Sequence, residues 1–164
     1  MNSKEFKDNI LPLADKIFPM VLRFLGNDAE AQDAVQEIII KLWMKKNKLD
    51  HHPNLMGFVF LTARNFCLDL LRQKQKEILV RTNKDLIADF YIDEDRNELE
   101  NLLILIRKSI DKLPENQREI ILLRDIDGFT FEEIVAITNL KIEHIRVLLS
   151  RARKQVRLQL KNTA

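Results

Sequence analysis

The chain has 164 residues, enough for one ordinary domain or two small ones, and this length excludes a large multidomain enzyme. With only 3 glycines and 4 prolines, it is poorly suited to turn-rich β-sandwiches, barrels and folds built on glycine loops. The formal net charge is only +2, but the charge is unevenly distributed along the chain. An all-α protein is therefore expected.

The single cysteine and the hydropathy pattern bear on the cellular setting. Cys67 can form no internal disulfide, and its apolar neighbours indicate a small buried thiol, which fits a reducing, cytoplasmic compartment. No apolar run reaches the roughly 18 residues that span a bilayer, and residues 1–8 lack the apolar core of a secretion signal. We expect an unexported protein with no membrane insertion.

The first half of the chain, residues 1–76, has the periodicity of a small helical module. Pro19 suits the first turn of a helix, and Gly26 followed by Asn27 suits a helix end and a new start. A loop is expected over residues 47–54, which include Pro53. The pattern predicts four helices, at about 4–17, 19–26, 28–47 and 55–76.

The predicted third helix has two contrasting faces. Its apolar stripe is wide enough for core packing and consists of Ala31, Val35, Ile38, Ile39, Leu42 and Trp43. The opposite face mixes large apolar side chains with acidic and amide ones, namely Asp33, Gln36, Glu37, Ile40 and Met44. Exposed apolar side chains beside charges favour a partner surface, although burial against the protein's own first helix would explain them equally well.

The predicted fourth helix has an apolar seam and a polar stripe. The stripe holds amides, cations and one aromatic ring, namely Phe58, Thr62, Asn65, Asp69, Arg72, Gln73 and Lys76. Such a mixture suits unpaired bases, which stack on rings and form hydrogen bonds along their exposed edges. Alternatively, Phe58 covers the core at the helix start. His51 and His52 are adjacent, which favours loop residues over metal ligands.

Residues 77–98 predict a flexible acidic linker. Residues 77–100 carry 8 acidic and 3 basic side chains, and they show few periodic apolar positions. Self-repulsion of these charges should extend the segment. We expect the linker to keep the two modules, residues 1–76 and 99–164, from packing against each other in a fixed way until a partner holds them.

The second module begins with an apolar helix over residues 99–113, followed by a helix over 115–124 and a turn at Asp127 and Gly128. Thr130 and Glu133 have the spacing of a capping box, so a helix starts there, and Asn139 can adopt the left-handed conformation that ends it. A last helix is predicted over residues 142–160. This order of elements is typical of a helix-turn-helix unit.

The last helix carries most of the basic charge. Ile145, Leu148 and Leu149 face inward with Ala152 and Val156. The outward positions are Glu143, Arg146, Val147, Ser150 and Lys154, with Arg151 and Arg157 at the edges, and Lys141 and Arg153 belong to the same basic segment. A basic stripe at helical spacing is expected of a nucleic-acid surface, and residues near the helix start would meet base edges. The alternative is a solvated helix face.

In this order the residues resemble the extracytoplasmic-function sigma factors of bacterial RNA polymerase, over nearly the whole chain. In the first module, the resemblance is carried by Asp33 to Glu37, Leu42, Trp43, Ala63, Arg64, Asn65, Asp69, Leu71 and Arg72. In the second, it is carried by Leu113 to Glu119, Asp127, Gly128, Glu132 to Ile134 and Ser150 to Lys154. The chain departs from the family where a glycine and a serine or threonine cap are common, with Asn139 and Lys141 instead.

The resemblance implies a dissociable initiation subunit that binds core RNA polymerase, directs it to promoter DNA and helps open the duplex. It implies that the mixed face of the third helix binds core polymerase. It also implies that Phe58, Thr62, Asn65, Arg72 and Lys76 meet the downstream promoter element, and that the outward residues of the last helix meet the upstream one. An anti-sigma factor is an expected partner, whereas no cofactor, metal or catalytic group is expected.

Two alternatives remain. A stand-alone helix-turn-helix regulator would act without core polymerase, and the first module argues against it. An RNA-binding adaptor could use the same basic helix but leaves the ordered set of motifs unexplained.

Overall fold

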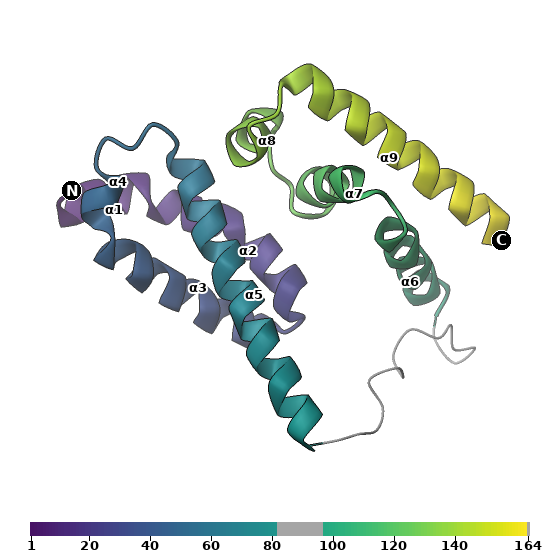
Figure 1. The fold of residues 1–164 in the computed structure, drawn as a ribbon, viewed down its shortest axis with the longest axis horizontal. Helices are drawn as coiled ribbons and strands as arrows, with labels where there is room; N and C mark the ends of the chain where they lie inside the picture. The colour runs from purple at the N-terminus through teal and green to yellow at the C-terminus, as the bar shows by residue number, and fades with distance from the viewer. Residues whose placement is uncertain (82–96, 164) are drawn as a thin grey trace.

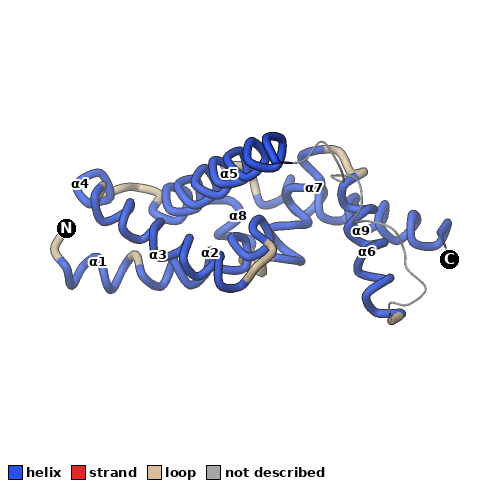
Figure 2. Tube along the Cα trace, turned by 90° about the horizontal axis from the view of Figure 1, so that it is seen from below, coloured by secondary structure: helices blue, strands red, loops and turns tan. Residues whose placement is uncertain are grey.

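The computed structural model describes residues 1–81 and 97–163, and within these ranges every regular element is a helix (Figures 1 and 2). The all-α prediction is confirmed. The first module contains α1 (Ser3–Asn9), α2 (Leu11–Leu25), α3 (Asp28–Met44), α4 (Lys46–Leu49) and α5 (Leu55–Arg81). The second contains α6 (Glu98–Asp111), α7 (Glu115–Ile121), a π-helical turn η1 (Leu122–Ile126), α8 (Phe131–Thr138) and α9 (Ile142–Thr163).

The core of the first module lies between α2, α3 and α5, which contact one another. Ile17 and Val21 of α2 are fully buried, as are Ile38 and Leu42 of α3 and Val59 of α5. These positions are three or four residues apart within each helix, so they lie on one face. The apolar stripe predicted for the third helix is therefore confirmed, as is the apolar seam predicted for the fourth, which consists of Val59, Ala63, Phe66 and Leu70 and packs in the core.

Two boundaries predicted in this module are wrong. The first break falls at Ile10 instead of residue 18, and α2 runs through Pro19 to Leu25. Pro12 occupies the first turn of α2, where a missing N–H costs nothing because those amides have no helical partner. In addition, the predicted loop over residues 47–54 starts inside the short helix α4, which buries Leu49 completely.

The predicted capping residues are confirmed. Gly26 ends α2 with a left-handed φ of 73°, and the Asn27 side chain accepts a hydrogen bond from the Glu30 N–H at 3.1 Å. At α8, the Thr130 hydroxyl accepts from the Glu133 N–H at 3.1 Å. The Thr130 N–H donates back to the Glu133 carboxylate at 3.0 Å, which completes the capping box.

The second module packs α7 and α6 against α9. Ile120, Leu123 and Ile145 are among its most buried side chains. The helix predicted to end at Arg124 continues as the π-helical turn to Ile126, and the chain then turns at Gly128 with a φ of 79°. Asn139 ends α8 in the left-handed conformation, as predicted, with a φ of 60°.

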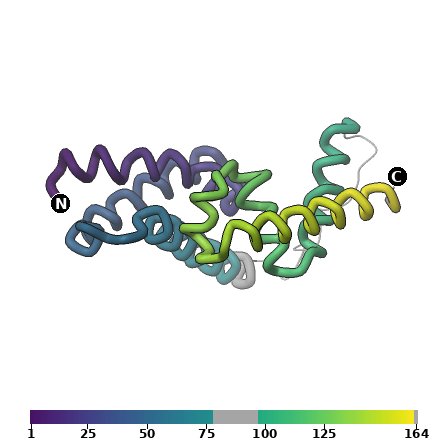
Figure 3. Tube along the Cα trace, turned by 90° about the horizontal axis from the view of Figure 1, so that it is seen from above, coloured from purple at the N-terminus to yellow at the C-terminus, as the bar shows by residue number. Residues whose placement is uncertain are grey.

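The two modules are in direct contact, so the expectation of no fixed packing is wrong. In Figures 1 and 3, α8 lies beside α5, and η1 also contacts α2. The physical reason is that the two modules present apolar side chains and opposite charges to each other, at Phe60 and Phe129, Lys16 and Glu133, and Arg23 and Asp127. Of the predicted linker, residues 77–81 belong to α5 and α6 begins at Glu98, while residues 82–96 lie outside the described part of the chain.

Candidate nucleic-acid and partner surfaces

The mixed face predicted for α3 is exposed. Ile40 is 58% exposed and Met44 79%, and the polar members Asp33, Gln36 and Glu37 are exposed as well. All five residues lie on the side of α3 that is turned away from its buried stripe. The alternative, in which α1 covers Ile40 and Met44, is therefore wrong, and the structure keeps two large apolar side chains in water beside two carboxylates.

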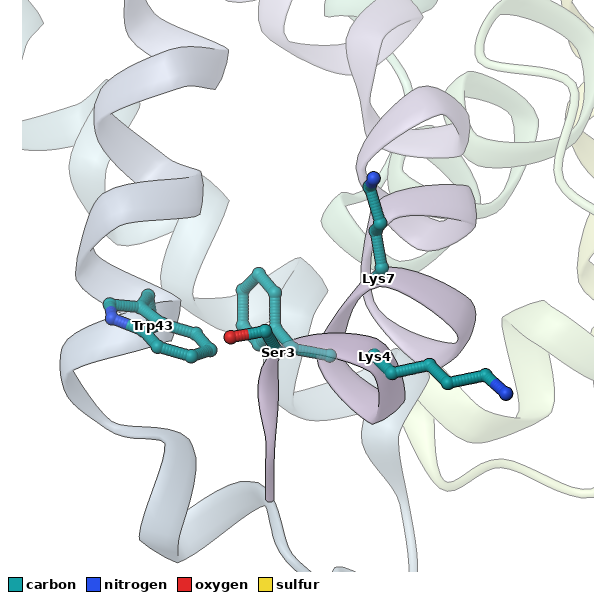
Figure 4. Close-up of a pocket in the computed structure, with 5 residues that line it drawn as sticks. Ser3, Lys4, Lys7 and Trp43 are labelled. Carbon is teal, nitrogen blue, oxygen red and sulfur yellow. The ribbon is translucent and has the colours of Figure 1, made fainter.

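At Trp43, the structure shows a hollow that sequence reasoning did not predict (Figure 4). It measures about 540 Å³ and lies between α1 and the end of α3. The rings of Phe6 and Trp43 meet edge to face there at 5.1 Å, and Lys46 lies 4.1 Å from the Trp43 ring centre. Lys4 and Lys7 line the α1 side. Trp43 looked like an ordinary core residue because it belongs to the apolar stripe.

The polar stripe predicted on α5 is a continuous surface, but its members differ in accessibility. Asn65, Arg72 and Lys76 are exposed, and Arg72 forms an exposed ion pair with Asp69 at 3.3 Å. The Thr62 hydroxyl donates to the Phe58 carbonyl at 2.9 Å, so its proton is used within the helix. Asn65 therefore offers an exposed amide in the half of the stripe next to Phe58, where the Thr62 hydroxyl is already engaged.

Phe58 covers the core at the start of α5 and is also partly exposed on the polar stripe. Its ring is half-buried and packs on the core, and its centre lies 5.3 Å from that of His52. The His52 Nδ1 atom accepts a hydrogen bond from the Asn54 N–H at 3.0 Å, which fixes the loop before α5. His51 and His52 are loop residues, as predicted. The contact of His52 with the stripe was missed because periodicity says nothing about loops.

A second side of α5 faces the other module. The Asn54 side chain caps α5 by accepting from the Gly57 N–H at 2.9 Å, and its Nδ2 donates to the Ala136 carbonyl of α8 at 2.7 Å. Phe60 meets Phe129 edge to face, with ring centres 5.9 Å apart. The loop that leads into the polar stripe is thus bonded directly to the second module.

Two ion pairs join α2 to the second module. Arg23 donates two hydrogen bonds to Asp127, both at 2.9 Å, and the Asp127 side chain is fully buried. Burial raises the pKa of Asp127, and the hydrogen bonds and charge of Arg23 offset part of that rise. Lys16 pairs with Glu133 at 2.9 Å. Burial is the largest single influence on Glu133 and raises its pKa. The hydrogen bonds from Thr130 and Lys16 together outweigh it and hold the pKa below the usual range.

The outward face predicted for the last helix is confirmed as exposed on α9. Every predicted member is exposed, whereas Ile145, Leu148 and Leu149 are buried; the exposed set is Lys141, Glu143, Arg146, Val147, Ser150, Arg151, Arg153 and Lys154. Arg153 differs from the other cations because it donates to both oxygens of Asp125, at 3.0 and 2.7 Å. Sequence reasoning counted it as available and missed its partner.

Among residues 1–81 and 97–163, no three histidine, cysteine, aspartate or glutamate side chains gather in a way that could hold a metal ion. Burial raises the pKa of the Cys67 thiol to about 11. No helix in the described part of the chain is both long and apolar enough to cross a membrane.

Comparison with known proteins accounts for both modules. The sigma-70 region 2 family matches residues 12–77, and the sigma-70 region 4 family matches residues 103–156. The chain is 27% identical to the ECF RNA polymerase sigma factor SigW of Bacillus subtilis strain 168, over 96% of this chain and 89% of that protein. The chain belongs to the extracytoplasmic-function class of the sigma-70 family. In this sigma factor, region 2 carries α3 and α5, and region 4 carries α8 and α9.

Solved structures share this fold, and one of them is a sigma factor. One is the sigma factor RpoE in complex with the anti-sigma factor NepR from Bartonella quintana. It has a TM-score of 0.59 and 25% identity to this sigma factor, and the match covers 96% of this chain and 98% of that one. Another is CnrH in complex with the cytosolic domain of CnrY, with a TM-score of 0.60, 19% identity and coverage of 99% and 92%, which bears on the fold alone.

Proposed function

We propose that the protein binds core RNA polymerase, directs it to specific promoters and promotes opening of the DNA at the start of transcription. The observation that carries this proposal is the presence, in one chain, of matched regions 2 and 4 that expose a partner face on α3 and a basic face on α9. The proposal gives the chain binding roles and no chemistry of its own, and it places the chain in the cytoplasm, with the polymerase and the DNA.

Transcription of fragmented genomic DNA tests the proposal. Core polymerase with the protein should start transcripts at a defined set of sites that core polymerase alone does not use, and the mapped sites should share two sequence elements. A stand-alone helix-turn-helix regulator would bind DNA without adding start sites to core polymerase. Co-purification with core polymerase separates the two functions, because only the sigma factor should bind it.

Within this function, we assign the exposed stripe of α5 to the unpaired bases of the downstream promoter element, with Asn65 as the main hydrogen-bonding residue. Its amide is exposed, whereas the Thr62 hydroxyl is already bonded to the Phe58 carbonyl. Arg72 and Lys76 follow on the same stripe and would meet phosphates. An amide that binds an extruded base acts in opening the duplex and not in assembly with core polymerase.

Asn65→Ala should therefore lower open-complex formation on a duplex promoter while core binding stays at the parent level. Permanganate reactivity of thymines in the bubble measures the opening. Gln75→Ala is the matched control, since it removes an exposed amide from another side of the same helix. Unchanged thymine reactivity in the Asn65 variant, or an equal loss in the Gln75 variant, would contradict the assignment.

We assign the outward face of α9 to the upstream promoter element. Arg146 lies in the first half of the helix, where side chains reach base edges in the major groove, and an arginine matches the paired acceptors of guanine. Lys154 lies two turns later and would meet a phosphate. Glu143, Val147 and Ser150 are exposed on the same helix and would face the same groove of the DNA.

Arg146→Ala should cost about 1 to 3 kcal/mol and flatten the preference at one or two positions of the upstream element. Lys154→Ala should weaken all sequences alike and reduce the salt slope of binding by about one unit. Both are measured with the assembled polymerase on a library of duplexes at two salt concentrations. If Arg146→Ala keeps the preferred sequence, or Lys154→Ala changes it, Val147 and Ser150 become the residues that read the bases.

We also propose an anti-sigma factor as a partner. The structurally similar RpoE is bound to one. In this chain, α6 exposes three leucines on one face, with Leu99 at 64%, Leu102 at 44% and Leu103 at 51%. Exposed leucines at this spacing form an apolar face of the kind that a protein partner covers.

A further inference from the structure

Phe131, the first residue of α8, lies between two arginines of region 4. The Arg146 guanidinium of α9 lies 5.6 Å from the ring centre, and that of Arg124 lies 4.7 Å from it. Arg124 also donates to the Phe129 carbonyl at 2.9 Å. The capping box formed by Thr130 and Glu133 fixes the backbone at Phe131. The ring is thus fixed at the start of α8, within reach of the Arg146 guanidinium.

Asp125, six residues before Phe131, forms an ion pair with Arg153, another arginine of α9. Its carboxylate accepts two hydrogen bonds from Arg153 and raises the pKa of that guanidinium. Both side chains are partly exposed, 49% for Arg153 and 33% for Asp125. Arg146 and Arg153 lie seven residues apart, about two turns, so they project from nearly the same side of α9. Both line one hollow of about 380 Å³ with Phe131 and Ser150.

The two contacts differ in how many N–H donors, and how much charge, they leave available on each arginine. A ring restrains a guanidinium through its face, so the N–H groups at the edge of the guanidinium remain free to donate and its charge is not cancelled. A carboxylate instead occupies the N–H groups in pairs and cancels the charge locally. Arg146 is therefore oriented with free donors, whereas Arg153 has two of its donors and its charge engaged by Asp125.

We propose that Phe131 is a positioning residue that orients Arg146 for base recognition, while Asp125 withholds Arg153 from the DNA backbone. This inference rests on the proposed role of α9 at the upstream promoter element. The segment from η1 to the start of α8 thus sets how two arginines of α9 are used: Arg146 is oriented toward a base, and Arg153 is kept from phosphate. Sequence preference then depends on a residue that itself touches no base.

The test for Phe131 uses polymerase assembled with the full-length protein and a duplex library randomised at the upstream element. Phe131→Leu keeps an apolar side chain but removes the ring face, and it should lower the preference for the base that Arg146 reads by about threefold to tenfold, in line with the strength of such contacts. Phe131→Tyr keeps the ring and should retain the preference. A purely structural role would weaken all sequences equally.

A double variant separates positioning from packing. If Phe131 acts through Arg146, the variant with both Phe131→Leu and Arg146→Ala should show the same preference as Arg146→Ala alone. Thermal unfolding of each variant shows that the folded state is retained. Equal preferences for the parent and Phe131→Leu, a uniform loss over all sequences, or additive losses in the double variant would each overturn the positioning role.

Asp125→Asn tests the other half. Releasing Arg153 should raise affinity for all sequences, steepen the dependence on salt by about one unit through one more phosphate contact, and leave the preferred sequence unchanged. Unchanged affinity and salt slope would overturn this half. Failure of the proposed function is seen separately: in that case the parent protein would give core polymerase no sequence preference, and no variant would matter.

Discussion

Met44→Asp should weaken assembly with core polymerase about a hundredfold, which corresponds to about 3 kcal/mol. The Met44 side chain is 79% exposed at the end of α3, beside Ile40 at 58%. If this face docks on the clamp helices of core polymerase, as the family resemblance implies, a carboxylate placed there is buried without a partner. Such burial costs several kcal/mol, whereas the same change in a solvated surface costs almost nothing.

Leu61→Asp is the matched control for this experiment. Leu61 is 54% exposed on α5, outside the mixed face of α3, and the change from an apolar side chain to a carboxylate is the same. Binding of labelled core polymerase to each variant gives the comparison, with the helical circular dichroism signal as the check on folding. A folded Met44 variant that binds core polymerase as tightly as the parent would remove α3 from the interface.

Arg23→Met should open the contact between regions 2 and 4. Asp127 is fully buried and its two hydrogen bonds from side chains come from Arg23. Removing one partner of a buried pair leaves an uncompensated charge and costs about 3 to 5 kcal/mol. Because Arg23 and Asp127 belong to different modules, the protein can avoid this cost by separating the modules and hydrating the carboxylate. We therefore expect separation without unfolding of either module.

The effect of Arg23→Met should depend on pH. We call the arrangement in which the two modules are in contact closed, and the one in which they are separated open. Burial raises the pKa of Asp127 in the closed arrangement, so its carboxyl keeps a proton there at pH values at which it has lost the proton in the open one. Closure therefore weakens as pH rises above the ordinary aspartate range. Without Arg23 the pKa should rise further, so the variant should be open at neutral pH and close again as acid protonates Asp127.

A distance between two labels measures this opening. Gln32 on α3 and Gln155 on α9 are exposed and can be replaced by labelled cysteines, while the buried Cys67, whose thiol pKa is about 11, should react slowly. Arg64→Met is the control, because Arg64 also reaches the other module, at 3.9 Å from Glu119, but both side chains are about 40% exposed. Exposed pairs contribute about 0 to 1 kcal/mol. Equal distances in the parent and in Arg23→Met would contradict the prediction.

The exposed faces could be predicted because they depend only on local periodicity. On α3 and α9, residues three or four positions apart share a face, so the buried stripe also identifies the exposed one. The caps at Asn27 and Thr130 could be predicted for the same reason, since each bonds to a residue three positions later. Pro19 misled the prediction because a proline in a helix interior is disfavoured but tolerated when the packing on both sides of it is retained.

The contacts between modules could not be predicted in this way. Arg23 and Asp127 are 104 positions apart, and Asn54 and Ala136 are 82 apart, so neither pair leaves a periodic signal. Phe131 was also missed, because a half-buried aromatic residue at a helix start looks like part of the core. Its contact with Arg146 depends on the angle between α8 and α9, which the sequence does not encode locally.

The contact between the modules depends on the absence of a side chain at Gly57. A Cβ atom at this position would lie 2.8 Å from the Ala136 carbonyl oxygen and 2.5 Å from Asn54 Nδ2, closer than real Cβ atoms approach such atoms. The Asn54 side chain could not simply move aside, because it donates the hydrogen bond to that carbonyl. One base change in the glycine codon, to alanine, therefore adds a methyl group that separates the modules and leaves every charge in place. A lineage could lose the closed arrangement in a single step while keeping the exposed stripe of α5 and the outward face of α9, the two surfaces proposed to bind DNA, intact.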